Sequence, residues 1–262
     1  MDQKYNLSEH IFWKSLMDNL QPIILQAGEK LIKDVETTGE FPKRKGPVQL
    51  PEPYHYYYQL FWHSSNLMNS IERLKDIQVF IKSFPGRHYF EKNRITQNKW
   101  ISYHYSNYVL TTISLYDIAL RLTNNVFRLG IPDNKCNNDV VKNNLWVEKT
   151  PVKRALERLD TQIHTYRKPR NLYLHMGQLP ELEQLNMLDI MSLAQLESEK
   201  SLFPQRDLNR LYALATKEIC KNLEAERLKI TEAIWCLFDA FLPIYEAFHK
   251  KLKESVGHDQ KT

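Results

Sequence analysis

Hydrophobic residues along this chain recur every three or four positions, which is the spacing of one face of an α-helix. Five long segments have this pattern: residues 8–36, 54–84, 90–129, 150–165 and 208–254. A shorter apolar run covers residues 185–196. No segment alternates apolar and polar residues as a half-buried strand does. The pattern therefore predicts an all-α fold, a helical bundle of four to five long helices with shorter helices inserted.

Residues that end or start helices divide these segments. Four prolines and a Lys43-Arg44-Lys45 cluster make residues 40–53 an extended loop. The cluster is either simply solvated, which is the favoured interpretation, or a contact for nucleic acid. Residues 130–149 are polar and rich in asparagine, so we expect mostly loop with one short helical turn. Residues 256–262 are expected to be a frayed tail, and the whole chain, residues 1–262, to form a single domain.

Two helix starts have recognisable N-caps. Ser8 is the expected N-cap of the first helix, because its hydroxyl can accept a hydrogen bond from a free backbone N–H. Thr150 is the expected N-cap of a later helix, with Pro151 as its first residue, where the missing N–H of proline costs nothing.

Composition indicates a globular protein and limits its chemistry. Hydrophobic residues make up 42% of the 262 residues, and the net charge of +5 is compatible with a polyanionic partner. Three widely spaced cysteines, Cys136, Cys220 and Cys236, indicate reduced thiols and a cytoplasmic location. We expect neither a signal peptide nor a membrane-spanning helix. The sequence lacks phosphate-binding glycine loops, the H-E-x-x-H motif and a zinc-ligand spacing, so no metal or cofactor is expected.

The segment from position 168 to position 177 carries the most specific chemistry. Pro169 suits the first position of a helix, which would place Arg170 and Asn171 in the first turn. Asn171 and His175 are four residues apart and share a face, whereas Arg170 is rotated from His175 by about 140°. The long arginine side chain can still reach the same space. Free N–H groups at a helix start attract anions, so the segment predicts a phosphate site beside an imidazole that can transfer protons near neutral pH.

Arg170, Asn171 and His175 together resemble the R-x4-6-H signature of the HEPN superfamily (higher eukaryotes and prokaryotes nucleotide-binding). These are all-helical domains, many of them metal-independent ribonucleases in toxin–antitoxin, abortive-infection and CRISPR-linked systems. The family often has a polar residue directly after the arginine, which Asn171 matches. A second arginine–histidine spacing, Arg158 to His164, has a leucine after the arginine and lies within another predicted helix.

The resemblance implies a HEPN-like fold and a role for each motif residue. His175 would transfer a proton when the 2′-hydroxyl of RNA attacks the adjacent phosphorus. Arg170 would bind the scissile phosphate, and Asn171 would orient the histidine or the phosphate. Arg167 and Lys168 would extend the positive rim that binds RNA, and Tyr173 either lines the cleft or packs in the core.

The resemblance also implies partners. One motif supplies one histidine, so a homodimer with two motifs facing one cleft is expected, together with RNA and with an antitoxin or other regulatory protein. Two alternatives remain open: a HEPN-like protein that binds RNA or a nucleotide without cutting it, and a helical interaction or scaffold protein in which the motif is accidental. RNA binding without cleavage products would separate the first alternative from the enzyme.

Overall fold

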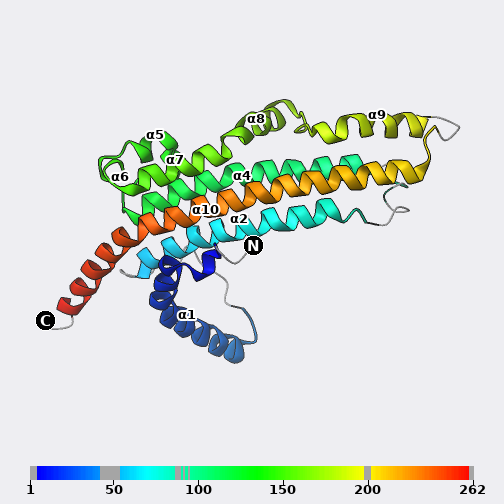
Figure 1. Cartoon of the computed structure of the whole chain (residues 1–262). Helices are drawn as coiled ribbons and strands as arrows, with labels where there is room; N and C mark the ends of the chain where they lie inside the picture. The colour runs from blue at the N-terminus through cyan, green and yellow to red at the C-terminus, as the bar shows by residue number, and fades with distance from the viewer. Residues whose placement is uncertain are drawn as a thin grey trace. The chain divides into compact units, whose positions relative to one another are not determined.

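All regular structure in the described part of the chain is helical, as the hydrophobic pattern predicts (Figure 1). The computed structural model describes residues 5–41, 54–85, 90, 92–93, 95–197 and 202–259. The longer helices are α1 (Ile11–Thr38), α2 (Tyr54–Lys82), α4 (Gln97–Val126), α7 (Pro151–Ile163), α8 (Arg167–Met176), α9 (Glu183–Glu197) and α10 (Gln205–Asp259). The loop predicted for residues 40–53 lies, from residue 42 on, outside the described residues.

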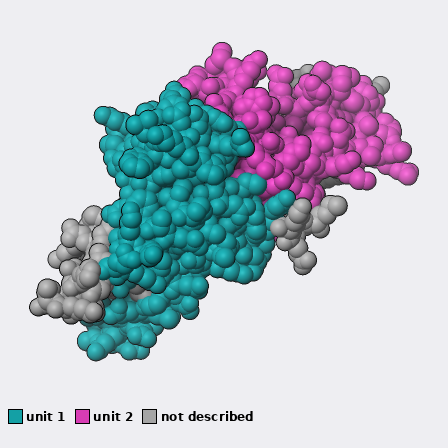
Figure 2. Space-filling model, turned by 60° about the vertical axis from the view of Figure 1, so that its left-hand side comes forward, with its two compact units in different colours: residues 1–68, 117–157, 234–262 teal, residues 69–116, 158–233 magenta. Residues whose placement is uncertain are grey.

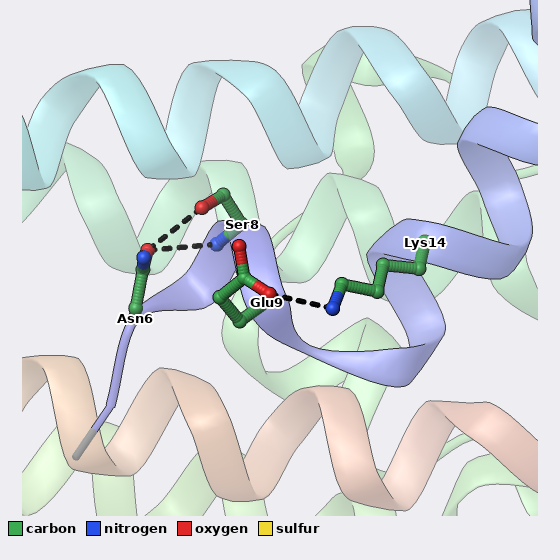
Figure 3. A network of polar contacts seen from close by, with 4 residues as sticks. All are labelled: Asn6, Ser8, Glu9 and Lys14. Atoms are coloured by element: carbon green, nitrogen blue, oxygen red, sulfur yellow. Dashed lines mark hydrogen bonds and ion pairs between the residues drawn. The ribbon is translucent and has the colours of Figure 1, made fainter. Parts of the chain in front are cut away.

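The N-terminal cap of α1 differs from the prediction. Ser8 lies inside a short 3-10 helix, η1 (Leu7–Glu9), where its N–H and its hydroxyl both donate to Asn6 Oδ1 (Figure 3). His10 is the N-cap instead, because its Nδ1 accepts a hydrogen bond from the Phe12 N–H at 3.0 Å. The other ring nitrogen, Nε2, lies 3.0 Å from Asp239 Oδ1 on α10. This contact between distant parts of the chain fixes the histidine as the cap.

The segment predicted as loop at residues 130–149 contains three short helices: η2 (Asp133–Lys135), α5 (Asn138–Lys142) and α6 (Leu145–Glu148). The prediction of one short turn was therefore wrong. Asn137 caps α5 by accepting from the Val140 N–H at 3.1 Å, and Asn144 caps α6 by accepting from the Trp146 N–H at 3.0 Å. Asparagine is a strong N-cap residue, so an asparagine-rich segment can start several helices.

The tail predicted for residues 256–262 also differs, because α10 continues to Asp259. Two boundaries agree with the sequence, whereas α4 (Gln97–Val126) is shorter than the helix predicted for residues 90–129. Helix α7 begins at Pro151, and α1 ends at Gly39, whose φ of 69° is the left-handed conformation common after a helix. In the described residues, no helix combines the length and apolar character needed to cross a membrane.

The chain divides into two compact units (Figure 2). Unit 1 comprises residues 1–68, 117–157 and 234–262. In unit 1, the fully buried Phe12 of α1 lies 5.2 Å from Phe238 and 5.5 Å from Tyr245, measured between ring centroids. Asn19 Nδ2 donates to the Tyr245 hydroxyl at 2.9 Å. These contacts pack α1 on the C-terminal part of α10.

Unit 2 comprises residues 69–116 and 158–233. Its core lies where α4 meets α10: the fully buried Tyr108 of α4 donates from its hydroxyl to the Leu223 carbonyl at 3.0 Å. Asn98 of α4 donates to Asp189 of α9 at 2.6 Å. Unit 2 contains the whole of α8, and therefore all the residues of the predicted site. The single domain expected for residues 1–262 stays a prediction.

Candidate active site

Helix α8 begins two residues earlier than the sequence predicts. Helix α7 leads directly into a 3-10 turn, η3 (His164–Tyr166), and α8 follows at Arg167, so Pro169 is the third helical residue and not the first. Tyr166 already has helical backbone angles, φ −82° and ψ −11°. A proline in the first turn removes no helical hydrogen bond, and Lys168 is helical although the position before a proline usually disfavours that conformation.

This start changes how an anion would be held. The Arg167 N–H is bonded to the His164 carbonyl, and Pro169 has no N–H. Two of the first three residues of α8 therefore present no free backbone N–H. The sequence predicted a helix start with free N–H groups for an anion. The structure has fewer of them, so fewer backbone donors are available to an anion at this helix start than the sequence predicts.

The three motif side chains lie on this short helix. Arg170 is half-buried, and its Nη1 donates to Asn171 Oδ1 at 3.0 Å. Asn171 and His175 are exposed. Among the described residues, the His175 ring has no hydrogen bond, ion pair or ring contact. Asn171 thus contacts the arginine of the motif within this chain, and the imidazole is open to solvent.

A buried contact attaches the start of α8 to α10. Tyr166 is 5% exposed, and its hydroxyl donates to Glu226 Oε2. Burial raises the pKa of Glu226, an effect that nearby Lys229 partly offsets. The Tyr166 ring also lies 5.9 Å from that of Tyr108 on α4. The sequence analysis did not identify Glu226. The signal for it in the sequence is weak: it is an acidic residue that lies between apolar positions of the last helix.

The family model described as Cthe2314-like HEPN matches residues 62–229, which is more than half of the chain. The chain belongs to the HEPN superfamily. The comparisons with curated proteins and with solved structures gave no match. HEPN domains are frequently ribonucleases, and they often bind RNA and dimerise. The matched residues include all of α8, so the motif lies inside the HEPN part of the chain.

The two basic residues beside the HEPN motif, Arg167 and Lys168, differ in their contacts within the chain. Arg167 pairs with Asp160 on α7 through Nη2, and its guanidinium carbon lies 5.8 Å from the centre of the Tyr116 ring. Lys168 is exposed and forms no ion pair within the described residues. Tyr173 is half-buried. Lys168 is thus the more available of the two cations for a ligand.

Apolar side chains are exposed around the HEPN motif. Leu174 is 50% exposed, Met176 is 72% exposed and Leu179 is 47% exposed. Gly177 ends α8 with a φ of 66°, and its N–H donates to the Tyr173 carbonyl at 3.1 Å. In the described residues, no group of three or more His, Cys, Asp or Glu side chains is placed to hold a metal ion.

Proposed function

We propose that this HEPN protein is a metal-independent endoribonuclease that cuts RNA by 2′-hydroxyl transesterification. The observation that carries the proposal is the placement of Arg170 and an open His175 on one short helix inside the family match. An imidazole that is open to solvent can reach a substrate and accept or donate a proton.

In the proposed reaction, the 2′-oxygen forms a bond to the adjacent phosphorus, and the bond from phosphorus to the 5′-oxygen breaks. The products are a 2′,3′-cyclic phosphate and a free 5′-hydroxyl. His175 accepts the proton of the 2′-hydroxyl or donates one to the 5′-oxygen. Arg170 binds the phosphate oxygens as negative charge builds on them, and Asn171 holds the guanidinium by the hydrogen bond at 3.0 Å.

We propose that the complete site forms between two copies of the chain. One copy supplies one motif histidine, and a second copy would supply the second proton-transfer group. The exposed side chains of Leu174 and Met176 support this arrangement, since an interface would cover them. Lys168, Tyr173 and Arg167, once Arg167 leaves Asp160, would line the path of the RNA.

A toxin or phage-defence role in the cytoplasm, held in check by an antitoxin or other regulatory protein, belongs to the same proposal. The alternatives are a HEPN protein that binds RNA or a nucleotide without cleavage, and a scaffold protein.

The test compares the two motif residues Arg170 and His175 with a control histidine of the same unit. Arg170→Ala and His175→Ala should each lower kcat/KM for RNA cleavage by about 10²- to 10³-fold, the usual loss for a proton-transfer or charge-stabilising group. His164→Ala is the matched control, because His164 is also an exposed histidine, and its Nδ1 lies 3.0 Å from the Thr161 carbonyl oxygen. Cleavage that is unchanged in both motif variants would refute the proposal, and RNA binding without products would favour the non-catalytic alternative.

A further inference from the structure

A cavity of about 550 Å³ lies in unit 2, apart from the residues of the motif. It is lined by the end of α2 at Lys82, the start of α4 at Gln97 and one side of α10 that includes Asn209, Lys217 and Lys221. All of these residues fall within the family match at 62–229. Ligand cavities in proteins usually measure roughly 300–1,000 Å³, so its size suits a small ligand or part of a larger one.

Small side chains on α10 create the hollow. Ala213, Thr216 and Cys220 line it, and Thr216 and Cys220 are buried. The Cys220 thiol donates to the Gln78 carbonyl at 3.7 Å, which fixes this wall to α2. Among the described residues, the buried Thr216 Oγ1 has no hydrogen-bond partner, so it adds one unpaired polar atom to the lining of the cavity.

Positive charge gathers at this cavity. Lys82, Lys217 and Lys221 are exposed, and none of them forms an ion pair with another described residue. Glu224 is the single acidic residue among the described lining residues. Three ammonium groups around one hollow repel one another, and a bound anion would offset that repulsion.

Amide groups add neutral donors to the ammonium groups. Asn209 accepts a hydrogen bond from Gln205 Nε2 at 3.1 Å through its Oδ1, which directs its NH₂ group away from that bond. Gln97 contributes a second side-chain amide. Amide and ammonium donors together match the several acceptor oxygens of neighbouring phosphate groups.

We propose that this cavity binds consecutive phosphate groups, either those of a nucleic-acid strand or those of a free oligophosphate. The proposal does not use Arg170 or His175, so it stands or fails independently of the ribonuclease proposal.

The experiment measures binding to the full-length protein by titration calorimetry at several salt concentrations. The probes are inorganic tripolyphosphate and a single-stranded 2′-deoxyoligonucleotide, which lacks the hydroxyl needed for cleavage. The charge variant is Lys217→Gln/Lys221→Gln. Its matched control is Lys30→Gln/Lys33→Gln on α1, which removes the same charge from exposed positions of another helix. The steric variant is Ala213→Phe, with Ala225→Phe at an exposed α10 position outside the cavity as its control.

We expect both cavity variants to weaken binding by about tenfold or more, while both controls bind as the unmodified protein does. For the oligonucleotide, the negative slope of log K against log salt should become less steep by about 1.4 in the charge variant, roughly 0.7 for each lost phosphate contact on a single strand. Tight binding of tripolyphosphate alone identifies a free oligophosphate as the ligand, and tight binding of the oligonucleotide identifies a strand. The proposal is overturned if neither probe binds, if Lys30→Gln/Lys33→Gln weakens binding equally, or if Ala213→Phe has no effect.

Discussion

Removing the Tyr166 hydroxyl tests how the start of α8 is held in place. Phenylalanine keeps the buried ring beside Tyr108 and deletes only the donor to Glu226. A hydrogen bond to a charged group contributes about 1.5–3 kcal/mol, and its loss leaves the partly buried carboxylate without that donor. We therefore expect Tyr166→Phe to lower the free energy of unfolding by about 2 kcal/mol at neutral pH.

The partner variant, Glu226→Gln, separates the hydrogen bond from the charge. Glutamine retains a carbonyl oxygen for Tyr166 and carries no charge. Burial raises the pKa of Glu226 in the folded protein, so the folded state holds the proton more tightly than the unfolded chain. The stability contributed by the protonated form is fully present below the ordinary glutamate pKa and is lost as the pH rises through the raised pKa. In the Glu226→Gln variant, the free energy of unfolding should therefore no longer show the decrease with rising pH that the titration of Glu226 causes.

Urea unfolding followed by circular dichroism measures both effects, with the two single variants and the double variant at a series of pH values. Tyr173→Phe is the matched control, because Tyr173 is a half-buried tyrosine on α8 whose hydroxyl has no hydrogen bond to another described residue. The reasoning is refuted if Tyr166→Phe unfolds at the same urea concentration as Tyr173→Phe, or if Glu226→Gln keeps the full pH dependence.

Two further predictions concern helix ends. Burial lowers the pKa of His10, an effect only partly offset by Asp239, and protonation would place a hydrogen on the Nδ1 that caps α1. The stability from neutral His10 is present above the ordinary histidine pKa of about 6.5 and is lost as the pH falls through the lowered pKa. His10→Asn keeps a cap without titrating, so its melting temperature should fall less on acidification, and an equal fall would contradict this account. Gly177→Ala should destabilise by about 1 kcal/mol because φ is 66°, whereas Gly28→Ala, inside α1 with nothing within 4 Å of the added Cβ, should stabilise by about 0.5–1 kcal/mol. Urea unfolding checks both signs, and the same sign for both variants would contradict the reasoning.

Local rules predicted some helix boundaries, at positions where a single residue decides the backbone conformation. Gly39 and Pro151 end and begin helices as the sequence indicates, because left-handed angles and a missing N–H are properties of one residue. The same kind of rule failed at Pro169. There the buried contact of Tyr166 with Glu226, 60 positions away, accompanies a helical backbone that begins before the proline. A preference of one residue was outweighed by tertiary packing that the sequence pattern does not reveal.

The residues of the candidate site and of the cavity also differ in how far the sequence could predict them. Arg170, Asn171 and His175 come from one short segment, so a sequence pattern locates them together, and the hydrogen bond between Arg170 and Asn171 is a contact of neighbours. Glu226 and the lysines of the cavity come from helices that only the folded chain brings together. Lys217 and Lys221 are four residues apart and share a face of α10, but no spacing in the sequence relates them to Lys82 on α2 or relates Glu226 to α8.

The histidines of unit 2 give a further reason to infer a second copy at the proposed active site. Transesterification is served best by one group that accepts a proton and another that donates one. Besides His175, the described histidines of this unit are His104 and His164. The His104 ring lies 4.4 Å from that of Trp100 and is stacked on Phe80, and burial lowers its pKa. His164 lies in the turn before α8, outside the motif. Neither of these histidines lies on the helix of Arg170 and His175, which supports the proposal that the motif of another chain supplies the second proton-transfer group.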